Sequence, residues 1–160
     1  MIRRIELLRG AWGTALLLAP EQVLAHVHHL RIDRAGVRVA RVLGARQLGQ
    51  AVLSGVDPSP EVLAMGVWVD GVHAATAVGL AVVDRQRARA GLTDAVIAGA
   101  YAVLGYRDLL TTGATPSSHQ RRRDELARAV LGLVPGGSGL LSRCALARTR
   151  AAGSRTRPRR

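Results

Sequence analysis

The chain has 160 residues, a net charge of +12 and a composition that is 48% hydrophobic but only 2% aromatic, with no Phe. A soluble core of this size usually contains aromatic side chains, because each of them buries a large area, so the composition favours helices packed closely through small residues. The single cysteine, Cys144, excludes an internal disulfide and a cysteine-based metal site.

The first apolar segment, residues 10–27, is short and is interrupted by the sequence Pro-Glu-Gln at 20–22. A signal peptide is one interpretation, since small residues follow the LLLA stretch at 16–19, but Glu6 and the Pro-Glu-Gln break argue against it. We expect instead a first helix that spans the membrane or lies at its interface.

The next two apolar segments, residues 37–56 and 62–83, are long enough to cross a membrane. The first of the two contains three Arg and two Gln, whereas the second has 22 residues with Asp70 and His73 as its ionisable groups, close to the ~20 residues that a span needs. Pro60 is well suited to the first turn of the second segment. A helix that is apolar on all sides is a membrane span or the centre of a large core, and a chain this short has little core to bury it.

A fourth segment, residues 92–106, can extend to Leu110, and Thr93 with Asp94 offers N-cap chemistry near its start. The composition then changes to a Gly-, Pro- and Ser-containing linker, a short amphipathic helix beginning at the RRR sequence of 121–123, and a basic terminus that reads as disordered. The sequence therefore predicts an all-α protein: a transmembrane bundle of three to four helices in residues 1–112, and a linker, short helix and disordered tail in residues 113–160.

The positive charge is concentrated in the second of these regions. Residues 1–112 contain 12 Arg and 9 acidic residues, a net of +3, whereas residues 113–160 contain 11 Arg and 2 acidic residues, a net of +9. Such a tail suits anionic lipid headgroups or acidic protein surfaces. Nucleic acid is not the partner we expect, because the tail has no interleaved aromatic residues and no recognition module.

The loop charges predict an orientation for the bundle. The turn at 57–61 has two acidic residues and no basic one, whereas the loops before residue 37 and around residues 84–91 are rich in Arg. The positive-inside rule then places the 57–61 turn outside and the Arg-bearing loops in the cytoplasm of a multi-pass plasma-membrane protein. The side on which the tail lies remains open.

Several polar residues of the predicted helices match in depth, and we expect them to form a buried network. Its members are Arg41, Arg46, Gln47, Gln50, Asp70, His73, Asp84 and Asp94. Pairing Arg46 with Asp70, and Arg41 with Asp94, lowers the cost of each charge in a bilayer. The pair Asp70 and His73 is interpreted first as part of a helix-packing network and second as a proton relay or ion site.

Two further patterns are weaker in specificity. Gly71, Ala75 and Gly79 recur every four residues, a small-residue ridge that lets helix backbones approach closely. His26 and His29 are the facing pair of the AHVHHL sequence, but no metal-binding motif surrounds them, so we interpret them as interfacial or loop residues and expect no metal.

The sequences RVLGARQLGQAVL and WVDGVHAATAVGLAVVDRQRARAGLTDAV, within residues 37–106, resemble a type of small, uncharacterised multi-helix membrane protein of actinobacteria. In that type, a Gly-x-Arg-x-Leu helix precedes an Asp-x-x-His helix and an Arg-rich turn. The resemblance implies a membrane bundle and brings no known activity.

These observations lead us to expect a small polytopic membrane protein with a structural or accessory role, in contact with lipid and with other membrane subunits. The alternatives are a proton- or ion-coupled carrier that uses Asp70, His73 and Arg46, and a soluble basic helical protein that binds nucleic acid through its tail. No nucleophile elbow, phosphate-binding loop or dinucleotide motif is present, so nothing indicates an enzyme or a cofactor.

Overall fold

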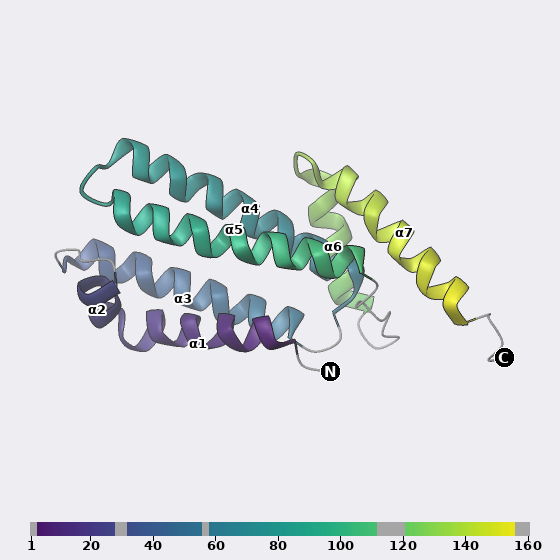
Figure 1. Cartoon of the computed structure of the whole chain (residues 1–160), viewed down its shortest axis with the longest axis horizontal. Helices are drawn as coiled ribbons and strands as arrows, with labels where there is room; N and C mark the ends of the chain where they lie inside the picture. The colour runs from purple at the N-terminus through teal and green to yellow at the C-terminus, as the bar shows by residue number, and fades with distance from the viewer. Residues whose placement is uncertain (1–2, 28–31, 56–57, 112–120, 156–160) are drawn as a thin grey trace. The chain divides into compact units, whose positions relative to one another are not determined.

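The computed structural model describes residues 3–27, 32–55, 58–111 and 121–155, and every regular element within these ranges is helical (Figure 1). In chain order the elements are α1 (Arg4–Leu18), α2 (Pro20–Gln22), the π-helical stretch η1 (Val23–Val27), α3 (Arg34–Ser54), α4 (Pro60–Val83), α5 (Ala88–Leu110), α6 (Arg121–Leu133) and α7 (Gly137–Arg155). The predicted all-α class is thus confirmed.

The chain forms two compact units. Unit 1 comprises Met1–Val56 and Val72–Gly99, and unit 2 comprises Asp57–Gly71 and Ala100–Arg160, so α4 and α5 each contribute one part to each unit. This division cuts across the predicted boundary at residue 112, because α6 and α7 pack with the start of α4 and the end of α5.

Short polar signals set the ends of α4 and α5. The Ser59 hydroxyl accepts a hydrogen bond from the Val62 N–H at 3.2 Å, and Pro60 occupies the first turn, as expected of a residue without an N–H. Between the helices, the Asp84 carboxylate accepts from the backbone N–H groups of Gln86 and Arg87 at 3.0 and 3.2 Å. The helix α5 therefore begins at Ala88.

The early start of α5 corrects the N-cap assigned to Thr93 and Asp94. Both residues lie inside the helix, where the Thr93 hydroxyl donates to the carbonyl of Arg89 at 2.9 Å. No cap at Thr93 or Asp94 is needed, because the Asp84 side chain accepts hydrogen bonds from N–H groups at the turn before α5.

The first apolar segment is divided into three pieces rather than forming one helix. Pro20 has no N–H to continue α1, so α1 ends at Leu18 and a new turn begins with Pro20. The helix α1 lies alongside α3 (Figure 1). Leu16, Val23 and Ala40 form the buried core of unit 1.

Close contact between α1 and α3 depends on two glycines. A Cβ on Gly13 would lie 2.9 Å from the carbonyl oxygen of Gly44, and a Cβ on Gly44 would lie 2.7 Å from the carbonyl oxygen of Gly13. The backbones meet directly at this crossing, so a side chain at either position requires the two helices to separate.

The predicted small-residue ridge of α4 does not have this role. Gly71, Ala75 and Gly79 are exposed, and a Cβ on either glycine meets nothing within 4 Å. The close approach between α4 and α5 in unit 1 uses the opposite side, where a Cβ on Gly91 would lie 2.7 Å from the carbonyl oxygen of Ala77. A four-residue spacing of small residues identifies one face of a helix, but it does not show whether another helix packs against that face.

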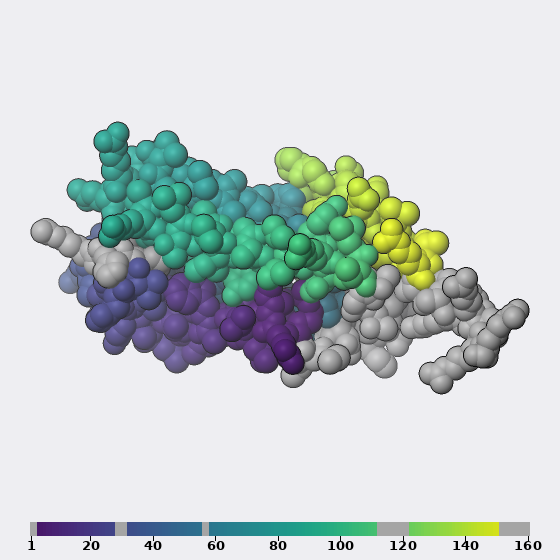
Figure 2. All heavy atoms as spheres, in the orientation of Figure 1, coloured from purple at the N-terminus to yellow at the C-terminus, as the bar shows by residue number. Residues whose placement is uncertain are grey.

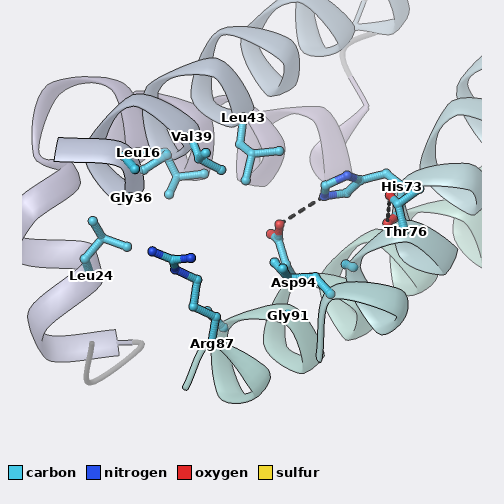
Figure 3. Close-up of a pocket in the computed structure, with 15 residues that line it drawn as sticks. Leu16, Leu24, Gly36, Val39, Leu43, His73, Thr76, Arg87, Gly91 and Asp94 are labelled. Carbon is cyan, nitrogen blue, oxygen red and sulfur yellow. Dashed lines mark hydrogen bonds and ion pairs between the residues drawn. The ribbon is translucent and has the colours of Figure 1, made fainter. Parts of the chain in front are cut away.

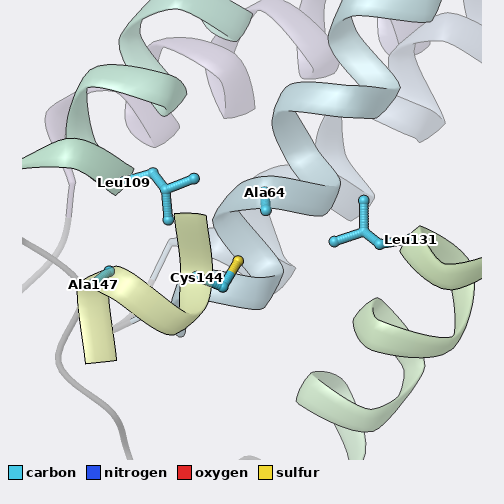
Figure 4. Packing of buried hydrophobic residues seen from close by; sticks show 5 residues of the cluster. All are labelled: Ala64, Leu109, Leu131, Cys144 and Ala147. Carbon is cyan, nitrogen blue, oxygen red and sulfur yellow. The ribbon is translucent and has the colours of Figure 1, made fainter. Parts of the chain in front are cut away.

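The core of unit 2 contains Ala64, Leu109, Leu131, Cys144 and Ala147, contributed by α4, α5, α6 and α7 (Figure 4). The short helix expected at the RRR sequence is present as α6. The turn that follows has Gly136 at φ 77°, a left-handed conformation that glycine adopts without strain.

The predicted disordered terminus needs correction up to Arg155. The helix α7 extends over Gly137–Arg155, and Ala147 and Arg148 of this helix contact the rest of unit 2. The basic composition of this segment suggested a solvated, disordered chain. Burial of one side of α7 stabilises the helix by more than the repulsion between its Arg side chains destabilises it. The remaining residues, 156–160, lie outside the described part.

Within the described residues, α4 is the one helix that is long and apolar enough to cross a membrane. A bundle of three to four spans, and a multi-pass topology, are thus not confirmed by helix length and composition. The helix α1, with 15 residues, is too short, and the charged residues of α3 and α5 lower the mean hydropathy of those two helices.

We expect Gly44→Ala to destabilise the protein, because the new methyl group meets the backbone of α1. Overpacking of this kind costs about 1–3 kcal/mol, against a gain of about 0.5–1 kcal/mol from the higher helix propensity of Ala. Gly49→Ala in the same helix is the matched control, since its Cβ meets nothing within 4 Å, and it should be neutral or stabilising. Thermal unfolding followed by far-UV circular dichroism measures both, and equal midpoints would contradict a tight crossing at Gly44.

Candidate functional site

Unit 1 contains a partly open cavity of about 380 Å³ between α1, η1, α3, α4 and α5 (Figure 3). Its lining residues are Leu16, Leu24, Ala35, Gly36, Val39, Ala40, Leu43, His73, Thr76, Ala77, Leu80, Arg87, Ala90, Gly91 and Asp94. Most of the wall is aliphatic, and the polar groups are few, which is the usual character of a small-molecule site.

His73 and Asp94 form the polar pair of the cavity wall. His73 Nε2 lies 3.0 Å from Asp94 Oδ2, and the two side chains are 16% and 14% exposed (Figure 3). The hydroxyl of Thr76 donates to the carbonyl of His73 at 2.9 Å, one turn along α4. The pair therefore joins α4 to α5 and leaves the second carboxylate oxygen of Asp94 without a partner among the described residues.

A second polar group, at the end of the cavity near the helix termini, is built around Arg87. Its Nη2 lies 2.8 Å from Asp33 Oδ2, and its Nη1 lies 3.1 Å from Asp84 Oδ2. The hydrogen bond from the Gly36 N–H, together with the nearby Arg87 guanidinium, lowers the pKa of Asp33. Arg87 thus connects the start of α3 to the turn between α4 and α5.

Buried charges also lie between α1 and α3. Arg9 Nη1 donates to Gln50 Oε1 at 2.8 Å and to Gln47 Oε1 at 3.4 Å, and Arg9 Nε lies 3.1 Å from Glu6 Oε2. Glu6 is also 2.8 Å from the guanidinium of Arg3. An ion pair that is removed from water in this way stabilises the helix contact only because further hydrogen bonds satisfy it.

Unit 2 has its own charged cluster, centred on Glu61. Arg148 donates to both carboxylate oxygens of Glu61, at 2.8 and 2.7 Å, and lies 3.3 Å from Asp124. Arg128 is 3.6 Å from Glu61. The hydrogen bonds that Arg148 donates to Glu61 raise the pKa of Arg148, so this guanidinium remains charged and joins α7 to α4 and α6.

Cys144 lies beside this cluster and is buried. Its thiol donates to the carbonyl of Pro60 at 3.3 Å. Burial, and secondly the negative charge of Glu61, raise the pKa of the thiol to about 12, so Cys144 is a protonated core residue rather than a nucleophile at neutral pH.

The predicted polar residues are placed as follows. Asp94 pairs with His73 and not with Arg41, which is exposed, and Asp84 caps the turn before α5. Asp70 is buried with 1% of its surface exposed, whereas Arg46 is half-buried. Because Arg46 and Asp70 belong to different units, their pairing stays a prediction.

Gln47 and Gln50 accept hydrogen bonds from Arg9 of α1, whereas the predicted network places them beside Arg46 and Asp70. Comparing the depths of polar residues along the predicted membrane helices did not identify Arg9 or Glu6, because both precede the first apolar segment. Their spacing of three residues in a segment rich in Leu was the available signal, since it places both on one helix face.

Sequence reasoning also missed Arg87, Glu61 and Arg148. Arg87 was assigned to a solvated loop, and Arg148 to the tail. No spacing rule links Glu61 to Arg148, because 87 residues separate them. Only the tertiary structure brings them together.

The two histidines considered for metal binding form no metal site in the described part of the chain. His26 Nδ1 is 3.0 Å from the carbonyl of Gln22, and His29 lies outside the described residues. Among the residues that the structure describes, no group of three His, Cys, Asp or Glu side chains is placed to hold a metal ion.

Comparisons with protein-family models, with curated proteins and with solved structures found no match to this chain.

We expect Arg148→Leu to destabilise unit 2, because it leaves the buried carboxylates of Glu61 and Asp124 without their main cation. Breaking a buried pair costs about 3–5 kcal/mol, and the partial exposure of Arg148 reduces our expectation to about 2 kcal/mol. Adding Glu61→Gln should recover part of the loss.

The matched control is Arg143→Leu in the same helix, where the side chain is exposed, and it should change stability by less than about 0.5 kcal/mol. Thermal unfolding by circular dichroism gives all three values. Equal effects of Arg143→Leu and Arg148→Leu would show that the cluster contributes no stability.

Proposed function

We propose that the chain is an integral membrane protein in which α1, α3, α4 and α5 are embedded, with a structural or accessory role. The observation that supports this proposal is the distribution of polarity: several charged side chains of these helices, among them Glu6, Arg9 and Asp70, are buried, while many large aliphatic side chains are exposed. In a water-soluble bundle the arrangement is the reverse.

The first helix gives the sharpest example. Glu6 and Arg9 are each 4% exposed, whereas Leu7 and Leu8, which lie between them in the sequence, are 61% and 67% exposed. Water would favour turning this helix so that the leucines are buried and the charges are solvated. Lipid favours the observed rotation, because intramembrane ionisable groups point toward other helices and pair there.

The helix α4 supports the same placement. Only 11% of its most apolar window of 18 residues is buried, although a core helix of a soluble protein is mostly buried. Val72, Val78, Leu80, Val82 and Val83 are all exposed. Its 24 residues match the thickness of a hydrocarbon core.

The helices α3 and α5 follow the pattern despite their charges. In α5, Val96 and Val103 are exposed while Asp94 points inward to His73. In α3, Val42 and Val52 are exposed while Gln47 is buried. In Figure 2 the atoms of α1 (purple) and of α5 (green) lie at the surface of the face shown.

The exposed Arg residues of α3 fit a membrane position through their place in the helix. Arg38 and Arg41 are in its first two turns, from which long side chains can reach the headgroup region. We place α6 and α7 at the membrane surface, beside the first turns of α4 and the last turns of α5 that they contact, because both are rich in Arg and their basic side chains suit anionic headgroups.

Fractionation tests the proposal directly. Membranes from cells that produce the chain are washed with alkaline carbonate and then with detergent, and the protein is followed in pellet and supernatant. We expect it to remain in the pellet after carbonate and to be released by detergent. Release by carbonate alone would overturn the membrane placement and favour the soluble nucleic-acid-binding alternative.

A substitution on the outer surface gives an independent measurement. Val96→Asp, at a position that is 71% exposed, should lower the amount of membrane-inserted protein, since an acidic residue near the middle of a span costs about 2.5–3.5 kcal/mol. Leu146→Asp in α7, at a position that is 50% exposed, is the control and should leave insertion unchanged. In a soluble protein, both surface changes would be tolerated equally.

A second candidate function, a proton- or ion-coupled carrier, is favoured by one observation: the His73–Asp94 pair is part of a cavity wall. Titratable groups that point into a cavity within a helical bundle often mark such a pathway. The structural role requires only that the pair join α4 to α5, so it needs fewer assumptions.

A further inference from the structure

We propose that the cavity of unit 1 binds a small lipophilic cation, with the positive centre beside the Asp94 carboxylate and the apolar body against the aliphatic wall. This inference goes beyond the membrane placement and does not depend on it, because every lining residue belongs to unit 1.

The apolar part of the ligand is specified by the wall. Leu16, Leu24, Val39, Leu43 and Leu80 supply branched aliphatic side chains from four different elements. The volume of about 380 Å³ lies in the range of roughly 300–1,000 Å³ that small-molecule sites occupy. The cavity is therefore large enough for a compact organic molecule with rings or branched chains.

The charge of the ligand follows from the acceptor that points into the cavity. Asp94 uses Oδ2 for His73, and Oδ1 has no partner among the residues that the structure describes. In Figure 3 the carboxylate of Asp94 and the ring of His73 point toward one another on one side of the cavity, and Leu43 and Val39 lie on the other side. A carboxylate oxygen in aliphatic surroundings attracts a cation strongly, because little water competes with it.

The guanidinium of Arg87 does not offset this preference. Its Nη1 is engaged with Asp84 and its Nη2 with Asp33, so both terminal nitrogens of the one cationic Arg in the wall are committed to carboxylates. With Asp94 included, these groups contain three negative charges and one positive charge. Because its guanidinium is shared between two carboxylates, Arg87 offers an anionic ligand little attraction beside Asp94.

The test measures binding of tetraphenylphosphonium to the purified full-length protein by equilibrium dialysis, with tetraphenylborate as a probe of the same shape and opposite charge. Detergent micelles without protein supply the blank. We expect saturable binding of the phosphonium that is at least about tenfold tighter than any binding of the borate, since a lost charge contact of about 1.4 kcal/mol corresponds to a factor of ten.

Two variants locate the site. Asp94→Asn should weaken phosphonium binding at least about tenfold without weakening borate binding, because it removes the charge and keeps the shape. Thr76→Trp, at an exposed position of the wall, should reduce binding by filling the cavity while Asp94 stays intact. Glu125→Gln, an exposed residue of α6, removes one negative charge elsewhere and should change nothing.

Each other outcome overturns the proposal. Equal binding of the two probes indicates an apolar cavity with no charge preference, such as one that accepts a lipid chain. Stronger borate binding indicates that Arg87 dominates. Binding of neither probe above the micelle blank, or phosphonium binding that survives both Asp94→Asn and Thr76→Trp in variants with native circular dichroism spectra, removes the site. None of these results bears on carbonate extraction, so the membrane placement is judged separately.

Discussion

The pairing of buried charges is the constraint on which both compact units depend. A carboxylate or guanidinium that leaves water must find an opposite charge or several hydrogen bonds, and each unit provides them from helices that are distant in sequence. In unit 1, Arg9 connects α1 to Gln50 of α3, and His73 connects α4 to Asp94 of α5. In unit 2, Arg148 and Glu61 do the same for α7 and α4.

These inward charges also explain why the exterior of the long helices is aliphatic. A helix whose polar face is used for contact with its neighbours has only its apolar face left for the surroundings. Leu7 and Leu8 of α1 and Val82 and Val83 of α4 are exposed for this reason. The proposed membrane placement and the proposed cation site rest on the same feature, because the polar groups that hold the bundle together also line its cavity.

The prediction of elements was more successful than the prediction of contacts. Apolar length and Pro60 were sufficient to locate α4, because these properties act within one helix. The pairing of Asp94 was predicted with Arg41 but occurs with His73, since depth along a helix does not specify rotation about its axis. The ridge of Gly71 and Gly79 shows the same limit, whereas Gly13 and Gly44, which were not selected, form the tight crossing.

The sequence by itself determined that the chain is helical, where its most apolar helix lies and that its C-terminal part is basic, because hydrophobic length, helix signals and net charge are properties of consecutive residues. The tertiary structure decided which charges meet, that α7 extends to Arg155, and that Asp94 points into a cavity. Those features depend on how each helix is rotated about its axis and on contacts between residues as far apart as Glu61 and Arg148. Such charges can be buried in pairs only when all the helices are packed together.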